Sequence, residues 1–182
     1  MTTPAGREFI PLSIAVLTIS DTRNEETDKS GGYLATTLQG AGHSLADKVI
    51  VKDDLYRIRA QVAQWIADEE IQVVITTGGT GFSQRDVTPE AVTPLLDKEI
   101  PGFGELFRML SFDQIGASTI QSRALGGLAN KTFVFALPGS ANACKTGWEL
   151  ILRDQLNYTH KPCNFVELMP SITQQWAERL GK

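Results

Sequence analysis

The sequence predicts an α/β fold in which helices lie on both sides of a largely parallel sheet. Short apolar runs, typical of strands buried on both faces, alternate along the chain with segments of helical periodicity. Such alternation favours parallel strands joined by right-handed crossovers through helices. The expected strands are residues 12–19, 45–51, 73–75 and 132–137.

Helices are predicted from apolar spacing and from residues that suit helix ends. Segment 55–69 repeats apolar residues at intervals of three and four, which is typical of an amphipathic helix. Ser30 is a suitable N-cap for a helix that ends near Gly40. Thr88 suits the N-cap of the next helix, followed by a proline in its first turn. Further helices are expected at 101–110, 144–156 and 171–180, with a short edge hairpin within 118–128.

Length and composition bound the class of protein. The 182 residues suit a single domain, 1–182, and the 42% apolar and 21% charged fractions are ordinary for a globular chain. A net charge of −4 gives no general attraction for nucleic acid or an anionic membrane. Two cysteines are too few for a disulfide framework, and the N-terminus lacks a signal-peptide pattern. We therefore expect a cytoplasmic protein that binds neither nucleic acid nor membrane.

Ligands of open α/β sheets bind beyond the carboxyl ends of the strands. That rule selects the loops 20–32, 52–54, 76–86 and 138–142. The third loop contains Gly78, Gly79, Thr80 and Gly81, and glycine lets backbone N–H groups approach an anion closely. The sequence here matches neither standard nucleotide-binding glycine motif. The alternative is a plain turn, but the position of this glycine segment after a buried strand favours a loop that binds a ligand.

Acidic residues at the same edge predict a divalent cation. Asp86 follows the glycine loop, where a carboxylate would repel a phosphate unless a cation lay between them. Mg²⁺ binds a few carboxylate oxygens together with substrate phosphates and water. Asp53, after the second strand, could share such an ion, although paired acids in this position are usually a solvated turn. Ser20 and Asp21, after the first strand, suggest a part in the same cation site less strongly. Arg85 could contact phosphate or remain a surface charge.

Segment 139–146 resembles a phosphate-binding P-loop at every position except one. Cys144 stands where the second glycine is required, so we expect this cysteine in the core instead. A helix starting after Pro138, Gly139 and Ser140 could still receive an anionic ligand at its N-terminus. The two histidines show no catalytic or metal-binding spacing, and both are expected at the surface. Ser122, Arg123 and Lys131 could contact phosphate, but as surface charges the two basic residues need no special role.

Several motifs together are similar to those of the molybdopterin adenylyltransferase family. They are TTGGTGFSQRDVTPEA at 76–91, DKSGG at 28–32, PGFGE at 101–105, QSRALGG at 121–127 and LPGS at 137–140. The resemblance runs from about residue 12 to residue 157, leaving 158–182 as a tail. The KPCNF segment at 161–165 looks most like the branch called molybdenum cofactor biosynthesis protein B.

The resemblance implies a three-layer α/β/α sandwich, the molybdopterin-binding fold. It implies Mg²⁺-dependent adenylylation of molybdopterin by ATP with release of pyrophosphate. It also implies a homotrimer or a hexamer of two trimers, and partners among other molybdenum cofactor biosynthesis proteins. A protein that binds molybdopterin without adenylylating it remains the alternative. A scaffold role, as in gephyrin-like relatives, would need domains that this sequence lacks.

The family's two important acids fall on Asp53 and Asp86, which become the expected catalytic and magnesium-binding residues. The same resemblance implies a substrate pocket lined by Ser20, Asp21, Gly78, Gly79, Thr80, Gly81, Ser122, Pro138, Gly139 and Ser140. Arg85 joins these candidates because of its position beside Asp86.

Overall fold

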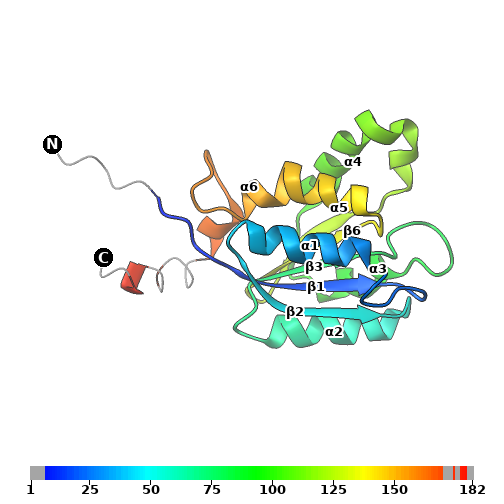
Figure 1. Cartoon of the computed structure of the whole chain (residues 1–182), viewed down its shortest axis with the longest axis horizontal. Helices are drawn as coiled ribbons and strands as arrows, with labels where there is room; N and C mark the ends of the chain where they lie inside the picture. Colours follow the sequence, from blue (N-terminus) through cyan, green and yellow to red (C-terminus); the bar gives the residue numbers. More distant parts are fainter. Residues whose placement is uncertain (1–6, 170–173, 175–176, 180–182) are drawn as a thin grey trace.

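A six-stranded sheet forms the centre of the molecule (Figure 1). The computed structural model describes residues 7–169, 174 and 177–179. Its strands are β1 (Ser13–Ile19), β2 (Ser44–Val51), β3 (Val73–Thr77), β4 (Lys98–Glu99), β5 (Leu125–Ala129) and β6 (Thr132–Leu137), in the spatial order β2-β1-β3-β6-β5-β4. The strands β2, β1, β3 and β6 are parallel, whereas β5 is antiparallel to both of its neighbours. A mostly parallel sheet with a short antiparallel edge is therefore confirmed.

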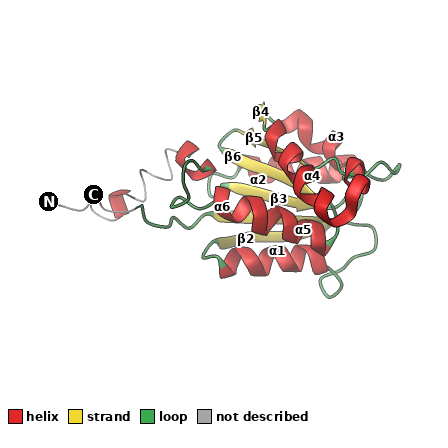
Figure 2. Cartoon of the chain, turned by 90° about the horizontal axis from the view of Figure 1, so that it is seen from above, coloured by secondary structure: helices red, strands yellow, loops and turns green. Residues whose placement is uncertain are grey.

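Helices cover both faces of the sheet and complete three layers (Figure 2). The helices are α1 (Lys29–Gly40), α2 (Leu55–Ala67), α3 (Thr88–Val92), α4 (Pro101–Ile115), α5 (Ala141–Gly147) and α6 (Arg153–Gln155). A π-helical turn, Trp148–Leu152, joins α5 to α6, and 3₁₀ turns lie at Thr93–Leu95, Gly116–Gln121 and Phe165–Leu168. None of the described helices is long and apolar enough to cross a membrane.

The sheet separates two apolar cores, which explains why β1 is apolar at nearly every position. Ile14 and Val16 pack into the core beneath α1, α4 and α5. Ala15 and Leu17, on the opposite face of the strand, pack into the core beneath α2 and α3. Because successive side chains of a strand point to opposite faces, a strand buried on both sides needs an uninterrupted apolar run.

The register of the parallel strands brings their carboxyl ends to one edge. Thr77 of β3 pairs with Thr18 of β1 and with Leu137 of β6. Ile19, the last residue of β1, pairs with Val51 of β2. The loops that follow these strands consequently start side by side.

The N-cap of α1 is Asp28, not Ser30 as the sequence predicts. The Asp28 carboxylate accepts a hydrogen bond from the Gly31 amide at 2.9 Å and another from Thr18 Oγ1 at 2.8 Å. It also forms an ion pair with Lys48 at 3.1 Å, and its side chain is fully buried. A carboxylate can satisfy all three groups, whereas a serine hydroxyl cannot, so aspartate takes the capping position.

Two other predicted helix starts shift by a few residues. Thr88 is the first residue of α3 and not its N-cap, because its hydroxyl donates to the Gly78 carbonyl at 2.8 Å instead of accepting from the helix. Helix α5 begins at Ala141, three residues before the predicted start. Ser140 caps it by accepting from the Ala143 amide at 3.1 Å.

The segment after 101 departs most from the sequence prediction. Helix α4 continues to Ile115, five residues beyond the predicted end, and 116–121 form a 3₁₀ turn where part of a hairpin was expected. The antiparallel edge itself is made by β5 with β4 and β6. The predicted last helix, 171–180, falls mostly outside the described residues.

His43 is buried, which contradicts the expected surface position. Its side chain is only 5% exposed and lies edge-on to Trp148, with ring centroids 6.2 Å apart. Its Nδ1 accepts a hydrogen bond from the Leu12 amide at 3.2 Å. Burial favours the neutral ring and lowers the pKa of His43 to about 4.

The burial of His43 predicts a loss of stability in mild acid. The unfolded chain takes up a proton on this ring as the pH falls below 6.5, whereas the folded chain does so only near its pKa of about 4. The free energy of unfolding should therefore fall by about 2–3 kcal/mol over that window. Urea unfolding at several pH values measures this fall. The variant His43→Gln keeps an acceptor for the Leu12 amide, and most of this fall in stability should be absent from it. An equal fall in both proteins would contradict the assignment.

Candidate functional site

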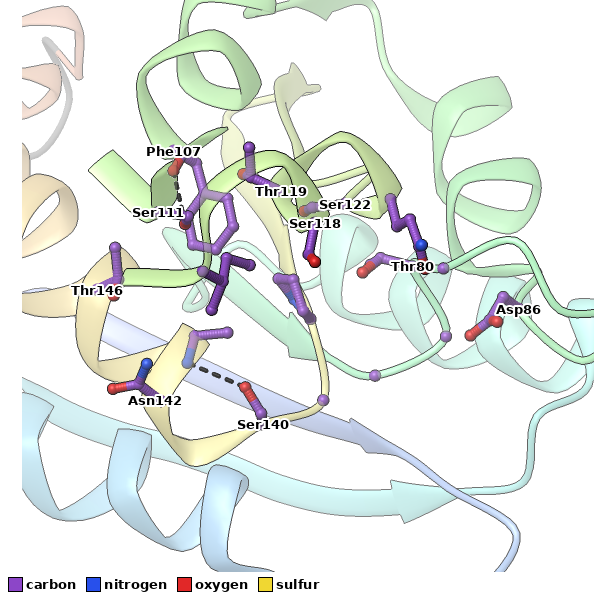
Figure 3. Close-up of a pocket in the computed structure, with 18 of the residues that line it drawn as sticks. Thr80, Asp86, Phe107, Ser111, Ser118, Thr119, Ser122, Ser140, Asn142 and Thr146 are labelled. Atoms are coloured by element: carbon purple, nitrogen blue, oxygen red, sulfur yellow. Dashed lines mark hydrogen bonds between the residues drawn. The ribbon is translucent and has the colours of Figure 1, made fainter. Parts of the chain in front are cut away.

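A cavity of about 450 Å³ opens at the carboxyl edge of the sheet (Figure 3). Its floor is made by the loops that follow β3 and β6. Its walls come from α4, the 3₁₀ turn after it, and α5. Nine of the residues predicted to bind substrate or metal line it: Gly78, Gly79, Thr80, Gly81, Asp86, Ser122, Pro138, Gly139 and Ser140.

The start of the glycine loop is packed so closely that side chains cannot fit there. Gly78 and Gly79 have φ angles of +110° and +64°, which residues with side chains rarely adopt. A Cβ on Gly78 would lie 2.2 Å from the Ile19 carbonyl oxygen, and one on Gly79 would lie 2.4 Å from Thr88 Oγ1. The Thr88 amide also donates to the Gly79 carbonyl at 2.9 Å. This turn is therefore fixed between β1 and α3.

Asp86 presents an ionised carboxylate at one end of the glycine loop. Its Oδ2 accepts from the Ser83 amide at 2.8 Å, and the Gly81 amide also donates to the carboxylate. Burial acts to raise the pKa of Asp86, but the bonds from Ser83 and Gly81 and the charge of Arg123 together lower it. The group is consequently charged at neutral pH.

Asp53 lies beside the same loop but outside the lining of the cavity. Its Oδ1 would be 3.5 Å from a Cβ on Gly79, so this carboxylate flanks the first half of the loop. Burial, followed by the negative charge of Asp21, raises the pKa of Asp53, and Asp86 contributes in the same direction. The negative charge of Asp86 thus acts on Asp53, and a cation between the two carboxylates would relieve the repulsion.

The other three predicted site residues lie on the Asp53 side of the loop. Arg85 forms an ion pair with Asp21 at 2.6 Å, and Asp21 Oδ1 accepts from the Asp53 amide at 3.3 Å. Ser20 Oγ accepts from the backbone amide of Thr22 at 3.2 Å and so shapes the turn after β1. The structure thus divides the predicted residues into those lining the cavity and a neighbouring charged cluster.

One wall of the cavity was not predicted from the sequence. It includes Phe107, Ser111 and Gln114 of α4, with Asn142 and Thr146 of α5. Gln114 donates to Thr146 at 2.9 Å and accepts from Asn142 at 2.6 Å, which ties the two helices together across the wall. The sequence does contain a signal for this wall, because polar residues at 111, 114 and 118 are spaced as on one face of a helix. The signal was missed because the helix was predicted to end at 110.

The charge of the cavity limits how it can hold an anion. Among the described residues, those that line it include no lysine or arginine, and Asp86 is their only carboxylate. Backbone amides, hydroxyl groups and side-chain amides are the donors that remain. The described part of the chain also contains no cluster of three or more metal-binding side chains. A divalent cation here would need oxygen atoms from substrate and water, which is the usual situation for Mg²⁺.

The near match to a P-loop at 139–146 does not form one. Cys144 is completely buried, as predicted, and its sulfur lies 3.2 Å from Thr77 Oγ1. Burial raises the pKa of this thiol to about 11, so it behaves as a packing residue. Lys145 is exposed and is not part of the cavity lining.

Comparisons with known proteins agree with this architecture. The family model described as "Probable molybdopterin binding domain" matches residues 15–158. Molybdenum cofactor biosynthesis protein B of Escherichia coli (strain K12) is 58% identical over 158 residues, covering 87% of this chain and 93% of that protein.

Solved structures are similar as well. A crystal structure of molybdenum cofactor biosynthesis protein B has a TM-score of 0.81 at 42% identity, covering 90% of this chain and 97% of the other. The tungsten cofactor synthesizing protein MoaB from Pyrococcus furiosus has a TM-score of 0.70 at 38% identity, covering 78% and 90%. This chain therefore belongs to the molybdopterin binding domain family of molybdenum cofactor biosynthesis proteins.

Proposed function

We propose that this chain adenylylates molybdopterin, using ATP with Mg²⁺ and releasing pyrophosphate. The observation that carries the proposal is the glycine loop flanked by Asp86 and Asp53, next to a cavity whose described lining has no cationic side chain. Both substrates are polyanions, and this site can bring them together only with added positive charge. The names of the relatives, molybdenum cofactor biosynthesis protein B among them, point to the same pathway.

The residues at the loop fit a magnesium ion. Asp86 is ionised, faces the cavity, and would supply one carboxylate oxygen. Asp53 would supply a second from the other side of Gly79, and binding a cation would lower its raised pKa. When bound, Mg²⁺ would neutralise charge on the triphosphate and on the pyrophosphate leaving group.

The remaining groups would bind and orient the two substrates. Backbone N–H groups of the glycine loop would hold phosphate oxygens. The first turn of α5, capped by Ser140, would add further donors. The amide and hydroxyl wall around Gln114 suits the polar edge of a heterocycle, and the exposed side chain of Ile115 offers an apolar surface for its ring. The closely packed loop keeps these donors in place before the ligand arrives, which reduces the cost of ordering them.

The reaction needs no covalent intermediate on the protein. An oxygen of the terminal phosphate of molybdopterin attacks the α-phosphorus of ATP. A new P–O bond forms while the bond between the α- and β-phosphates breaks, and pyrophosphate leaves with the electron pair. The attacking oxygen is already ionised, so no general base is required. The described lining of the cavity accordingly works without a histidine.

The direct test is to incubate the pure protein with molybdopterin, Mg²⁺ and ATP labelled at the α-phosphate. The proposal predicts labelled adenylyl-molybdopterin and one pyrophosphate for each turnover. Saturable binding of molybdopterin with no labelled product would instead favour a protein that binds the pterin without transferring the nucleotide.

Replacing Asp86 by asparagine should leave the fold intact but reduce adenylyl transfer by roughly a hundredfold or more, a change of about 3 kcal/mol in the activation barrier. Asparagine keeps the size of the side chain and removes its charge, so the cation loses an anionic ligand. Steady-state rates over a magnesium titration measure the effect. Lys145→Ala is the matched control and should turn over normally, because Lys145 lies outside the lining. A normal rate for Asp86→Asn would remove this residue from the mechanism.

Asp53→Asn should have the same kind of effect through the second carboxylate. We expect a rate loss of roughly tenfold or more, accompanied by a higher magnesium requirement. Unchanged kinetics with Mg²⁺ and ATP would return Asp53 to an ordinary solvated turn.

We also propose that the chain self-associates, as a trimer or a hexamer, through the outer side of α4. Large apolar side chains stay exposed there: Met109 is 63% exposed, Phe112 58% and Ile120, in the turn after α4, 76%. Such a concentration of exposed apolar residues is typical of a protein interface. A second copy is the partner implied by the resemblance described above.

Light scattering tests this interface. The native chain should show three or six times the 19.9 kDa mass of one chain. The double variant Met109→Glu and Phe112→Glu should be smaller, because it places charges on the apolar patch. A native monomer, or an assembly unaffected by both substitutions, would contradict the proposal.

A further inference from the structure

Arg123 reaches the glycine loop from outside the cavity. Its Nε donates to the Gly81 carbonyl at 2.8 Å, and a terminal nitrogen donates to the Asp86 carbonyl at 2.7 Å. The other terminal nitrogen pairs with the Glu90 carboxylate on α3. The guanidinium group also lies over the ring of Phe82, 5.1 Å from its centroid. One side chain thus contacts both ends of the segment 81–86 and the helix that follows.

All three guanidinium nitrogens of Arg123 are engaged with the protein. Its side chain is 24% exposed, and the residue is not among those that line the cavity. An arginine that bound substrate phosphate would keep donors free and pointed into the cavity. These contacts therefore indicate a residue that acts through the loop and not on the ligand.

The backbone of Arg123 also fixes the orientation of the loop peptides. Its amide donates to the Thr80 carbonyl at 3.0 Å. In a trans peptide the C=O and the following N–H point in opposite directions. Holding the Thr80 carbonyl towards Arg123 consequently turns the Gly81 N–H the other way, where it donates to the Asp86 carboxylate.

We propose that Arg123 is a positioning residue that sets the carboxylate of Asp86 and the peptides of the glycine loop for the nucleotide and its cation. The inference rests on the proposed function, because the reaction it serves is adenylyl transfer. A guanidinium group is needed because its planar donors reach Gly81, Asp86 and Glu90 at once, and the single ammonium of lysine cannot match that geometry.

Arg59 provides a matched control. Its guanidinium also donates to backbone carbonyls at α3, to Glu90 at 2.9 Å and to Ala91 at 3.3 Å. It extends from α2, and none of its contacts is with residues 80–86. Arg59→Lys therefore removes the same type of bond from the same helix without touching the loop.

The first measurement is amide hydrogen exchange, which does not depend on activity. Arg123→Lys should speed exchange at Gly81 and Ser83 by about tenfold or more, because both amides face the carboxylate of Asp86, whose backbone carbonyl Arg123 holds. Arg59→Lys should leave both amides unchanged. Equal protection of these amides in native chain and Arg123→Lys would overturn the proposal.

The second measurement is a double-mutant cycle on the rate of adenylyl transfer. Arg123→Lys should lower the rate by about tenfold or more in the native chain and by less than about twofold when Asp86 is already asparagine. Equal effects in both backgrounds would show that Arg123 does not act through Asp86 and would overturn its positioning role. Where Arg123→Ala is used as a stronger change, thermal unfolding checks that this variant is folded.

Failure of the proposed function is distinguishable from failure of this inference. A native chain that forms no adenylylated product would contradict adenylyl transfer, and Arg123 is then judged by exchange and by the affinity for ATP with Mg²⁺, measured by calorimetry. Affinity about tenfold weaker in Arg123→Lys, with faster exchange, would still support positioning. Unchanged affinity would overturn it.

Discussion

The site depends on the close approach of the glycine loop to the end of β1 and the start of α3. Gly78 can lie against Ile19, and Gly79 against Thr88, only because a glycine has no side chain. The aligned register of β1, β3 and β6 brings the strand ends to the place where this contact forms. The two cores, one on each face of the sheet, fix that register, since a slip of one residue would exchange the side chains of β1 that fill them.

Charge around the loop follows from the same packing. Asp53 and Asp86 approach from either side of it, and only Asp86 is stabilised in its charged form by loop amides. Arg85 is paired with Asp21 and Arg123 is bonded to the loop, so neither arginine has its charge free for the cavity. An anionic ligand at this edge therefore meets hydrogen-bond donors but little positive charge, and a divalent cation would supply what is missing.

Much of the fold could be predicted from the sequence, because its signals are local. The apolar run of β1 and the spacing in α2 depend on burial patterns that a single segment reveals. The choice of Asp28 over Ser30 as a cap could not be predicted, since it depends on Thr18 and Lys48 from other strands. The burial of His43 likewise depends on Trp148, more than a hundred residues away.

The site was only partly predictable for the same reason. Glycines after a buried strand mark the loop directly, and Asp86 is adjacent to it in sequence. The wall around Gln114 belongs to α4, and Arg123 lies in the segment before β5. Both reach the loop only in the folded chain. Spacing along the sequence can mark the polar face of α4, but it does not say which loop that face will contact.

The shared metal site can be tested by anomalous diffraction from crystals grown with ATP and Mn²⁺, a scattering substitute for Mg²⁺. One strong metal peak is expected beside Gly79, bonded to Asp86 and Asp53 and to phosphate oxygens of the nucleotide. Nucleotide bound in the cavity with no metal at these carboxylates, or with the metal held elsewhere, would contradict it.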